Sequence, residues 1–213
     1  MAGVGFAPSP RHPIPFLRSP KEPESKGDPT TMNVALKEWA AIIRVLEQGR
    51  QVVLLRKGGI AEVEGRFEPT YREFLLYPTF EHQDIRLIAS EVRPFVRQTE
   101  AERKPGIVRI SSLAKVENVA QVHSLEEFER LGVEHVFTDA YIEQRLNYKP
   151  DLPLYVLLLR VSTLPHPVEI VETPAYAGCR SWVILDEDIP TEGASPVLTD
   201  QEFQRRAGLL LPR

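Results

Sequence analysis

Short blocks of hydrophobic and polar residues follow one another along this chain, and most blocks predict one helix or one strand. Apolar residues at mostly helical spacing predict a first helix over 32–48, which Gly49 would end. The polar connection 60–69 suits a hairpin between the two strands that flank it. Strands are predicted from apolar runs at 51–57, 71–77, 107–110 with a continuation over 113–122, 154–164, 168–171 and 182–185.

Capping residues and prolines predict the remaining helices. Capping boxes begin at Ser124 and Thr199, each with a glutamate three residues on, and predict a short helix after each. Thr138 or Asp139 would cap a further helix over 138–146. A charged segment over 81–103 is expected to be mostly helical, with a kink or break at Pro94.

These elements predict an α+β fold, because strict alternation of strands and helices is missing. About six short strands can close into a small mixed or antiparallel β-barrel with flanking helices. Residues 1–31 hold seven of the nineteen prolines and predict a disordered proline-rich tail. We therefore expect that tail, an α+β barrel domain over 32–190, and a linker with a short helix over 191–213.

Composition narrows the classes of protein. The 213 residues carry a net charge of −4, which argues against a polyanion binder held by bulk charge. The one cysteine excludes an internal disulfide framework and a four-cysteine zinc site. No apolar run approaches the roughly 18 residues that a membrane helix needs. We expect a cytoplasmic protein with no cofactor, no metal and no membrane partner.

Several motifs resemble a bacterial family catalogued as domain of unknown function 1802. The resemblance covers about residues 33–186 and implies little about activity, although some relatives look to be associated with a restriction-endonuclease domain. That association implies nucleic-acid, restriction or defence biology. The matching motifs are Ala35 to Ala40, Leu54 to Ile60, Phe74 to Gln83, Pro153 to Val161, and Tyr176 to Val183.

The order of elements is also similar to that of the PUA and ASCH-like small barrels. Those modules bind RNA, modified bases or nucleotides in a cleft beside the barrel, so the resemblance implies such a cleft here. In that pattern a basic residue follows the first strand, as Arg56 and Lys57 do in this sequence. Fold analogy alone does not establish function.

Arg56 and Lys57 are candidate ligand contacts because they end an apolar strand beside Gly58 and Gly59. Side chains alternate along a strand, so one of the two cations emerges at the rim of the core. A guanidinium suits a phosphate or a guanine edge. The ordinary alternative is a charge that reaches solvent or forms a structural ion pair.

The run Glu81-His82-Gln83 follows the strand that contains Tyr77. A carboxylate, an imidazole and an amide side by side can read a base edge or act as acid and base. They would otherwise be polar residues at a helix start. If the two strands end on the same side, Arg56 and His82 share one cleft.

Three further residues are candidates for a special role. Arg180 and Trp182 could present a stacking surface for a base, although a tryptophan at a strand start is usually core. Arg160 interrupts an apolar strand and needs a partner, for which Glu38 or Glu73 is expected. No HxxxH or CxxC spacing suggests a metal site.

The sequence thus predicts a binding module for nucleic acid or a nucleotide-like ligand. The alternatives are a metal-dependent nuclease or hydrolase that uses Glu81 and His82, and a non-catalytic interaction subunit whose protein partner binds the proline-rich tail or 81–103. No catalytic motif gives positive support for an enzyme. The ligand-binding residues expected are Arg56, Lys57, Tyr77, His82, Gln83, Arg180 and Trp182.

Overall fold

The computed structural model describes residues 30–57, 62–63, 66–67, 71–178 and 181–211. A curved seven-stranded sheet forms the framework, in the order β2-β7-β6-β5-β1-β8, with β9 paired to β7. β1 and β5 run parallel, and the other neighbours in this sheet are antiparallel. Its strands are β1 (Thr31–Trp39), β2 (Val53–Arg56), β5 (Glu73–Thr79), β6 (Ile107–Val122), β7 (Leu154–Val171), β8 (Trp182–Pro190) and β9 (Ser195–Pro196). β3 (Glu62–Val63) and β4 (Arg66–Phe67) form a separate pair.

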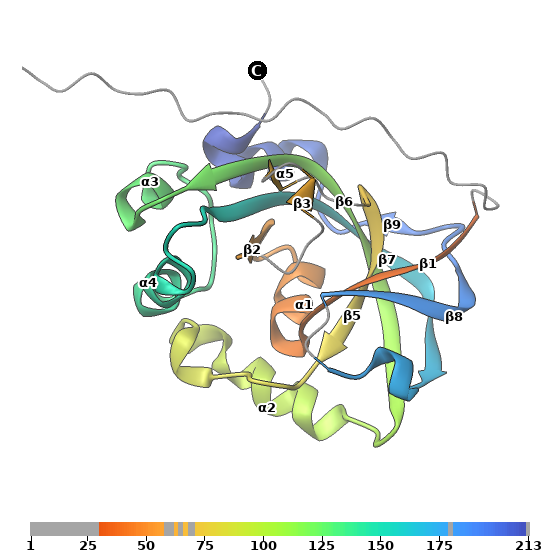
Figure 1. Cartoon of the computed structure of the whole chain (residues 1–213). Helices are drawn as coiled ribbons and strands as arrows, with labels where there is room; N and C mark the ends of the chain where they lie inside the picture. Colours follow the sequence, from red (N-terminus) through yellow and green to blue (C-terminus); the bar gives the residue numbers. More distant parts are fainter. Residues whose placement is uncertain (1–29, 58–61, 64–65, 68–70, 179–180, 212–213) are drawn as a thin grey trace, which may run out of the picture.

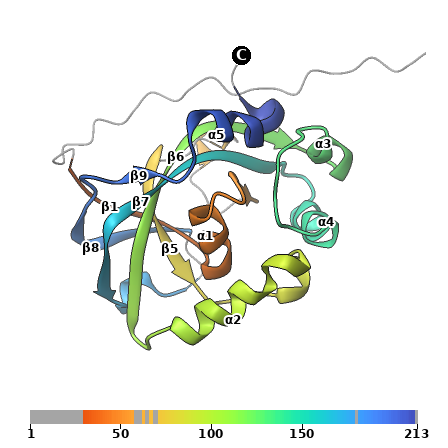
Figure 2. The same cartoon turned by 180° about the vertical axis from the view of Figure 1, so that it is seen from behind.

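Five α-helices and four 3-10 turns among the described residues accompany the sheet. α1 lies inside the curve of the sheet, and its apolar side chains are buried there (Figure 1, Figure 2). None of the described helices has the length and apolar character needed to span a membrane. The helices are α1 (Ala40–Glu47), α2 (Arg93–Glu102), α3 (Leu125–Glu129), α4 (Asp139–Asn147) and α5 (Asp200–Ala207); the 3-10 turns are η1 (Ile85–Leu87), η2 (Ser90–Val92), η3 (Pro174–Tyr176) and η4 (Gly208–Leu210).

The α+β class is confirmed, but the described sheet is not a closed barrel. β2 and β8 are its two ends and do not pair with each other. A small closed barrel fills its interior with side chains alone. Here a whole helix, α1, occupies the inner side of the sheet, which needs more room than a closed small barrel leaves.

The prediction of a helix over 32–48 is wrong for its first half. Residues Thr31–Trp39 form β1, and the helix begins only at Ala40. β1 is buried on both faces: Leu36 belongs to the main core, whereas Ala35 belongs to a second apolar cluster. Hydrogen bonds to β5 and β8 satisfy the backbone of β1. A strand that is buried on both faces does not alternate between apolar and polar residues, so the sequence lacks the usual sign of a strand here.

Strand pairing also differs from expectation. β2 pairs with β7, and β5 pairs with β1 and β6, so the predicted hairpin between the strands around 60–69 does not form. The stretch 168–171 is not a separate edge strand, because β7 continues to Val171 and pairs there with β6. Pro94 lies in the first turn of α2 rather than breaking a helix, where its missing N–H costs nothing.

The three predicted helix starts are confirmed. Ser124, Thr138 and Thr199 each accept a hydrogen bond from a backbone N–H of the helix they cap. The segment expected as a linker with a short helix contains α5, and it is packed: Phe203, Ala207 and Leu210 are in the main core, and β9 pairs with β7. Of the tail predicted over 1–31, residues 1–29 lie outside the described residues, and Thr31 already belongs to β1.

Arg160 does have charged partners, but not the two that we expected. Its guanidinium lies 3.4 Å from Glu117 and 2.7 Å from Asp200, and it covers the ring of Phe203. Glu73 instead pairs with Lys115 across the neighbouring strands. Arg160 therefore ties α5 to the sheet.

His135 should make stability depend on pH. Its ring packs edge-on against Phe128, 4.9 Å away, and burial lowers its pKa. An unfolded histidine has a pKa of about 6.5. Below that pH the unfolded chain binds the proton more readily than the folded one, so the free energy of unfolding should fall as pH drops from about 6.5. Urea unfolding between pH 7 and 5 should show wild type losing stability relative to His135→Phe; parallel curves would contradict this.

Candidate functional site

An open cleft of about 870 Å³ lies at the end of β1, a volume within the range of small-molecule sites. We call it the α4 cleft. Its walls are the end of β1, the end of β2, the loop 79–87 after β5, and α4, with Gly178 and Ser181 also bordering it. Its lining residues include Glu38, Arg56, His82, Gln83, Arg145 and Tyr148.

Arg56 is held in the wall of this cleft by a buried ion pair. Its Nη2 lies 2.9 Å from Glu38 Oε2, and the two side chains are only 12% and 9% exposed. The same nitrogen donates to the carbonyl oxygen of Lys37. Arg56 Nε is buried without a hydrogen-bond partner among the described residues. The guanidinium is thus fixed in place by the protein, with one donor unused.

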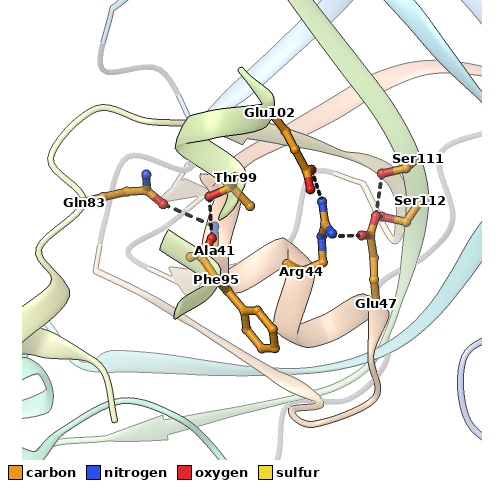
Figure 3. A network of polar contacts seen from close by, with 9 residues as sticks. All are labelled: Ala41, Arg44, Glu47, Gln83, Phe95, Thr99, Glu102, Ser111 and Ser112. Carbon is orange, nitrogen blue, oxygen red and sulfur yellow. Dashed lines mark hydrogen bonds and ion pairs between the residues drawn. The ribbon is translucent and has the colours of Figure 1, made fainter. Parts of the chain in front are cut away.

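The loop after β5 is shaped by an unusual backbone at His82. Its φ is 59°, in the left-handed region that residues other than glycine seldom adopt and that recurs at functional sites. His82 is exposed to the cleft. The next residue, Gln83, accepts a hydrogen bond from the N–H of Ala41 in the first turn of α1 (Figure 3). Trp39, the N-cap, provides no side-chain cap, so Gln83 does this instead.

One face of α4 lines the cleft. Tyr141, Gln144, Arg145 and Tyr148 recur at spacings of three and four residues and therefore share a side of the helix. Tyr141 stacks on Phe137 with ring centroids 4.7 Å apart. Burial first, and then the charge of Glu38, raises the pKa of Tyr141 to about 12. Its hydroxyl therefore stays protonated at neutral pH.

The structure brings together part of the predicted site. Arg56, His82 and Gln83 line the α4 cleft, and so does Glu81 of the hydrolase alternative. Lys57 does not: it is buried, and its Nζ donates to the carbonyl of Leu146 at the end of α4, 2.9 Å away. Burial, then repulsion from Arg145, lowers the pKa of Lys57. Arg180 lies outside the described residues.

Two predicted aromatic contacts do not line the cleft: one is buried in the core, and the other is partly buried against it. Tyr77 is buried in the second apolar cluster, and its hydroxyl donates to Glu172 at 3.4 Å. Burial, followed by the charge of Glu172, raises its pKa. Trp182 packs edge-on against Phe74 and Tyr71, with centroids 5.0 and 5.4 Å away. The ordinary explanation for Trp182, part of the core at a strand start, fits these contacts.

A smaller cavity of about 460 Å³ lies between α1, α2 and β6, and shares Lys37, Thr79 and Glu81 with the α4 cleft. A polar network borders it (Figure 3). Arg44 pairs with Glu102 at 2.5 Å and with Glu47 at 3.9 Å, and Glu47 accepts hydrogen bonds from Ser111 and Ser112. The network joins α1 to α2 and β6, with the one cation of Arg44 shared between two carboxylates.

Sequence reasoning missed the contribution of α4. The signal was present in part, because the capped helix carries Tyr141 and Arg145, and Tyr148 follows it at helical spacing. No feature of the local sequence indicates which face of this helix packs against the protein and which face lines the cleft. Among the described residues, no group of three His, Cys, Asp or Glu side chains is placed to hold a metal ion.

Comparison with known proteins identifies the family. Residues 35–208 match the family described as "Domain of unknown function (DUF1802)". The chain belongs to the DUF1802 family. No curated protein matches it.

A similar solved structure is the crystal structure of a point mutant of ZmASCH, a protein from Zymomonas mobilis. The sequence identity with this DUF1802 protein is 12% and the TM-score is 0.40, over 81% of this chain and 92% of that one.

Proposed function

We propose that the α4 cleft binds a nucleic acid or a nucleotide-like ligand. The observation that carries the proposal is a set of hydrogen-bond donors in its walls. Arg56 Nε, Gln83 Nε2 and Arg145 Nε are buried and have no partner among the described residues. A buried donor without a partner costs about 1–3 kcal/mol. Phosphate oxygens and base edges carry hydrogen-bond acceptors of the kind that these three donors lack.

The charges of the cleft suit a ligand with few phosphates. Its cations are Lys37, Arg56, Arg86 and Arg145, and its carboxylates are Glu38, Glu81 and Asp84. Two of these carboxylates are already paired, Glu38 with Arg56 and Asp84 with Arg86. The local balance is weakly positive in a chain whose net charge is −4. Affinity should therefore fall with salt, but with a shallow slope, since few counterions are released.

Fluorescence anisotropy with labelled RNA and DNA oligomers at low salt tests the proposal. Arg145→Glu should weaken binding at least tenfold, because it replaces an available guanidinium with a charge that repels phosphate. Arg130→Glu is the matched control: Arg130 is exposed near α3, outside the cleft, and has only a weak 4.0 Å contact with Glu127. It should bind as wild type does.

Two results would count against the proposal: no binding to any oligomer at low salt, or equal losses in Arg145→Glu and Arg130→Glu. Shortening of the oligomer when Mg²⁺ or Mn²⁺ is added, abolished by Glu81→Gln, would support the hydrolase alternative instead. Glu81 and His82 are both exposed at the cleft, so that reaction has access to the same ligand.

A further inference from the structure

Tyr148 is an aromatic side chain left open to solvent at the edge of the α4 cleft. Its exposed fraction is 53%, and among the described residues it is the one aromatic of four exposed large apolar side chains. The other tyrosine on this face of α4, Tyr141, is covered by Phe137 and Trp39. An exposed ring bordering a cleft is a surface on which a flat ligand can stack.

The backbone beside Tyr148 keeps a cation next to the ring. Lys149 has a φ of 51°, at the position after a helix end where glycine or asparagine is usual. A lysine there costs on the order of 1–3 kcal/mol, and that cost is typical of functional sites. The ammonium lies 5.6 Å from the centroid of the Tyr148 ring. Aromatic rings next to cations are the usual contacts of single-stranded nucleic acids.

Arg145 adds a second cation one turn earlier on the same face of α4. It lines the cleft, no ion pair to a carboxylate is found for it among the described residues, and its Nε has no hydrogen-bond partner there. Its planar guanidinium can hold two oxygens of one phosphate. Tyr148, Lys149 and Arg145 thus offer a stacking surface with two cations beside it.

The exposed ring and the dimensions of the cleft argue against a duplex. Base pairs stacked in a helix have no free face for Tyr148. A volume of about 870 Å³ accommodates a nucleotide but not a double helix.

We propose that the α4 cleft selects single-stranded nucleic acid, with an unpaired base stacked on Tyr148 and the adjoining phosphate held by Arg145 and Lys149. This inference rests on the proposed function and specifies its ligand. A free nucleotide offers the same base and phosphate, so the experiment includes it.

The test uses the full chain and anisotropy with one labelled oligomer, single-stranded and annealed to its complement. The single strand should bind at least tenfold more tightly than the duplex. Tyr148→Leu should weaken it by roughly 5- to 150-fold, the loss expected for one stacked base, whereas Tyr148→Phe should stay within about twofold of wild type. Because Tyr148 is exposed, unchanged thermal melting should show that both variants fold.

The outcomes separate the two proposals. Binding that is equal for strand and duplex, or unaffected by Tyr148→Leu, overturns the stacking inference and leaves the proposed function standing. No binding in any arm overturns the proposed function itself. If an unlabelled mononucleotide competes as tightly as the unlabelled single strand itself, that result overturns the proposal of a single-stranded ligand and identifies a free nucleotide as the ligand.

Discussion

Replacing Glu38 with alanine is expected to lower the free energy of unfolding by about 3–5 kcal/mol. The change removes the carboxylate that neutralises Arg56, and both side chains are nearly buried. A buried charge that has lost its partner cannot recover its hydration, which is why breaking such a pair costs this much. Glu38 also accepts a hydrogen bond from the N–H of Trp39 at the start of α1, and that bond is lost too. Urea unfolding followed by circular dichroism measures the change.

The double variant Glu38→Ala/Arg56→Met provides the control. It removes both charges, so it should recover much of the stability lost in Glu38→Ala. Equal stability of the single and double variants would show that the Arg56 charge needs no partner. In that case Arg56 would be open to water in solution, and its description as a guanidinium fixed by a buried ion pair would be wrong.

Helix starts that depend on interactions between near neighbours in the chain were predictable from the sequence. Ser124, Thr138 and Thr199 cap helices through hydrogen bonds to residues three positions away, so each signal lies within one short segment. β1 was not predictable in this way. It is buried on both faces, and a strand of that kind has no alternation to distinguish it from a helix.

Pairing between distant segments was the least predictable part. The length of the connection 60–69 suggested a hairpin, but β2 pairs with the apolar strand β7, about 100 residues away: Leu55 pairs with Val156. Contacts between distant segments also decide the different positions of Arg56 and Lys57. Alternation along the strand predicts that the two side chains point to opposite faces. It does not predict that Lys57 donates to the carbonyl of Leu146 in α4. The position of α4 also decides that Tyr148 borders the cleft.

The second large effect is expected at Gly208, which ends α5. Its φ is +56° with ψ at −133°, a backbone conformation nearly restricted to glycine. A Cβ there would lie 2.5 Å from the carbonyl oxygens of both Gly132 and Leu131. These are backbone atoms that cannot rotate away, and Leu131 already accepts a hydrogen bond from the N–H of Leu209. Gly208→Ala should therefore lower the free energy of unfolding by about 3 kcal/mol or more.

Gly106→Ala separates the two causes of that loss. Gly106 also has a positive φ, +72°, but a Cβ there meets nothing within 4 Å. It should lose only the conformational part, about 1 kcal/mol, in the same urea unfolding experiment. Similar losses in the two variants would mean that the end of α5 moves away from Gly132 at little cost. The contact of Gly208 with Leu131 and Gly132 would then contribute little to holding the C-terminal segment on the sheet. The buried side chains of Phe203, Ala207 and Leu210 would be its main attachment.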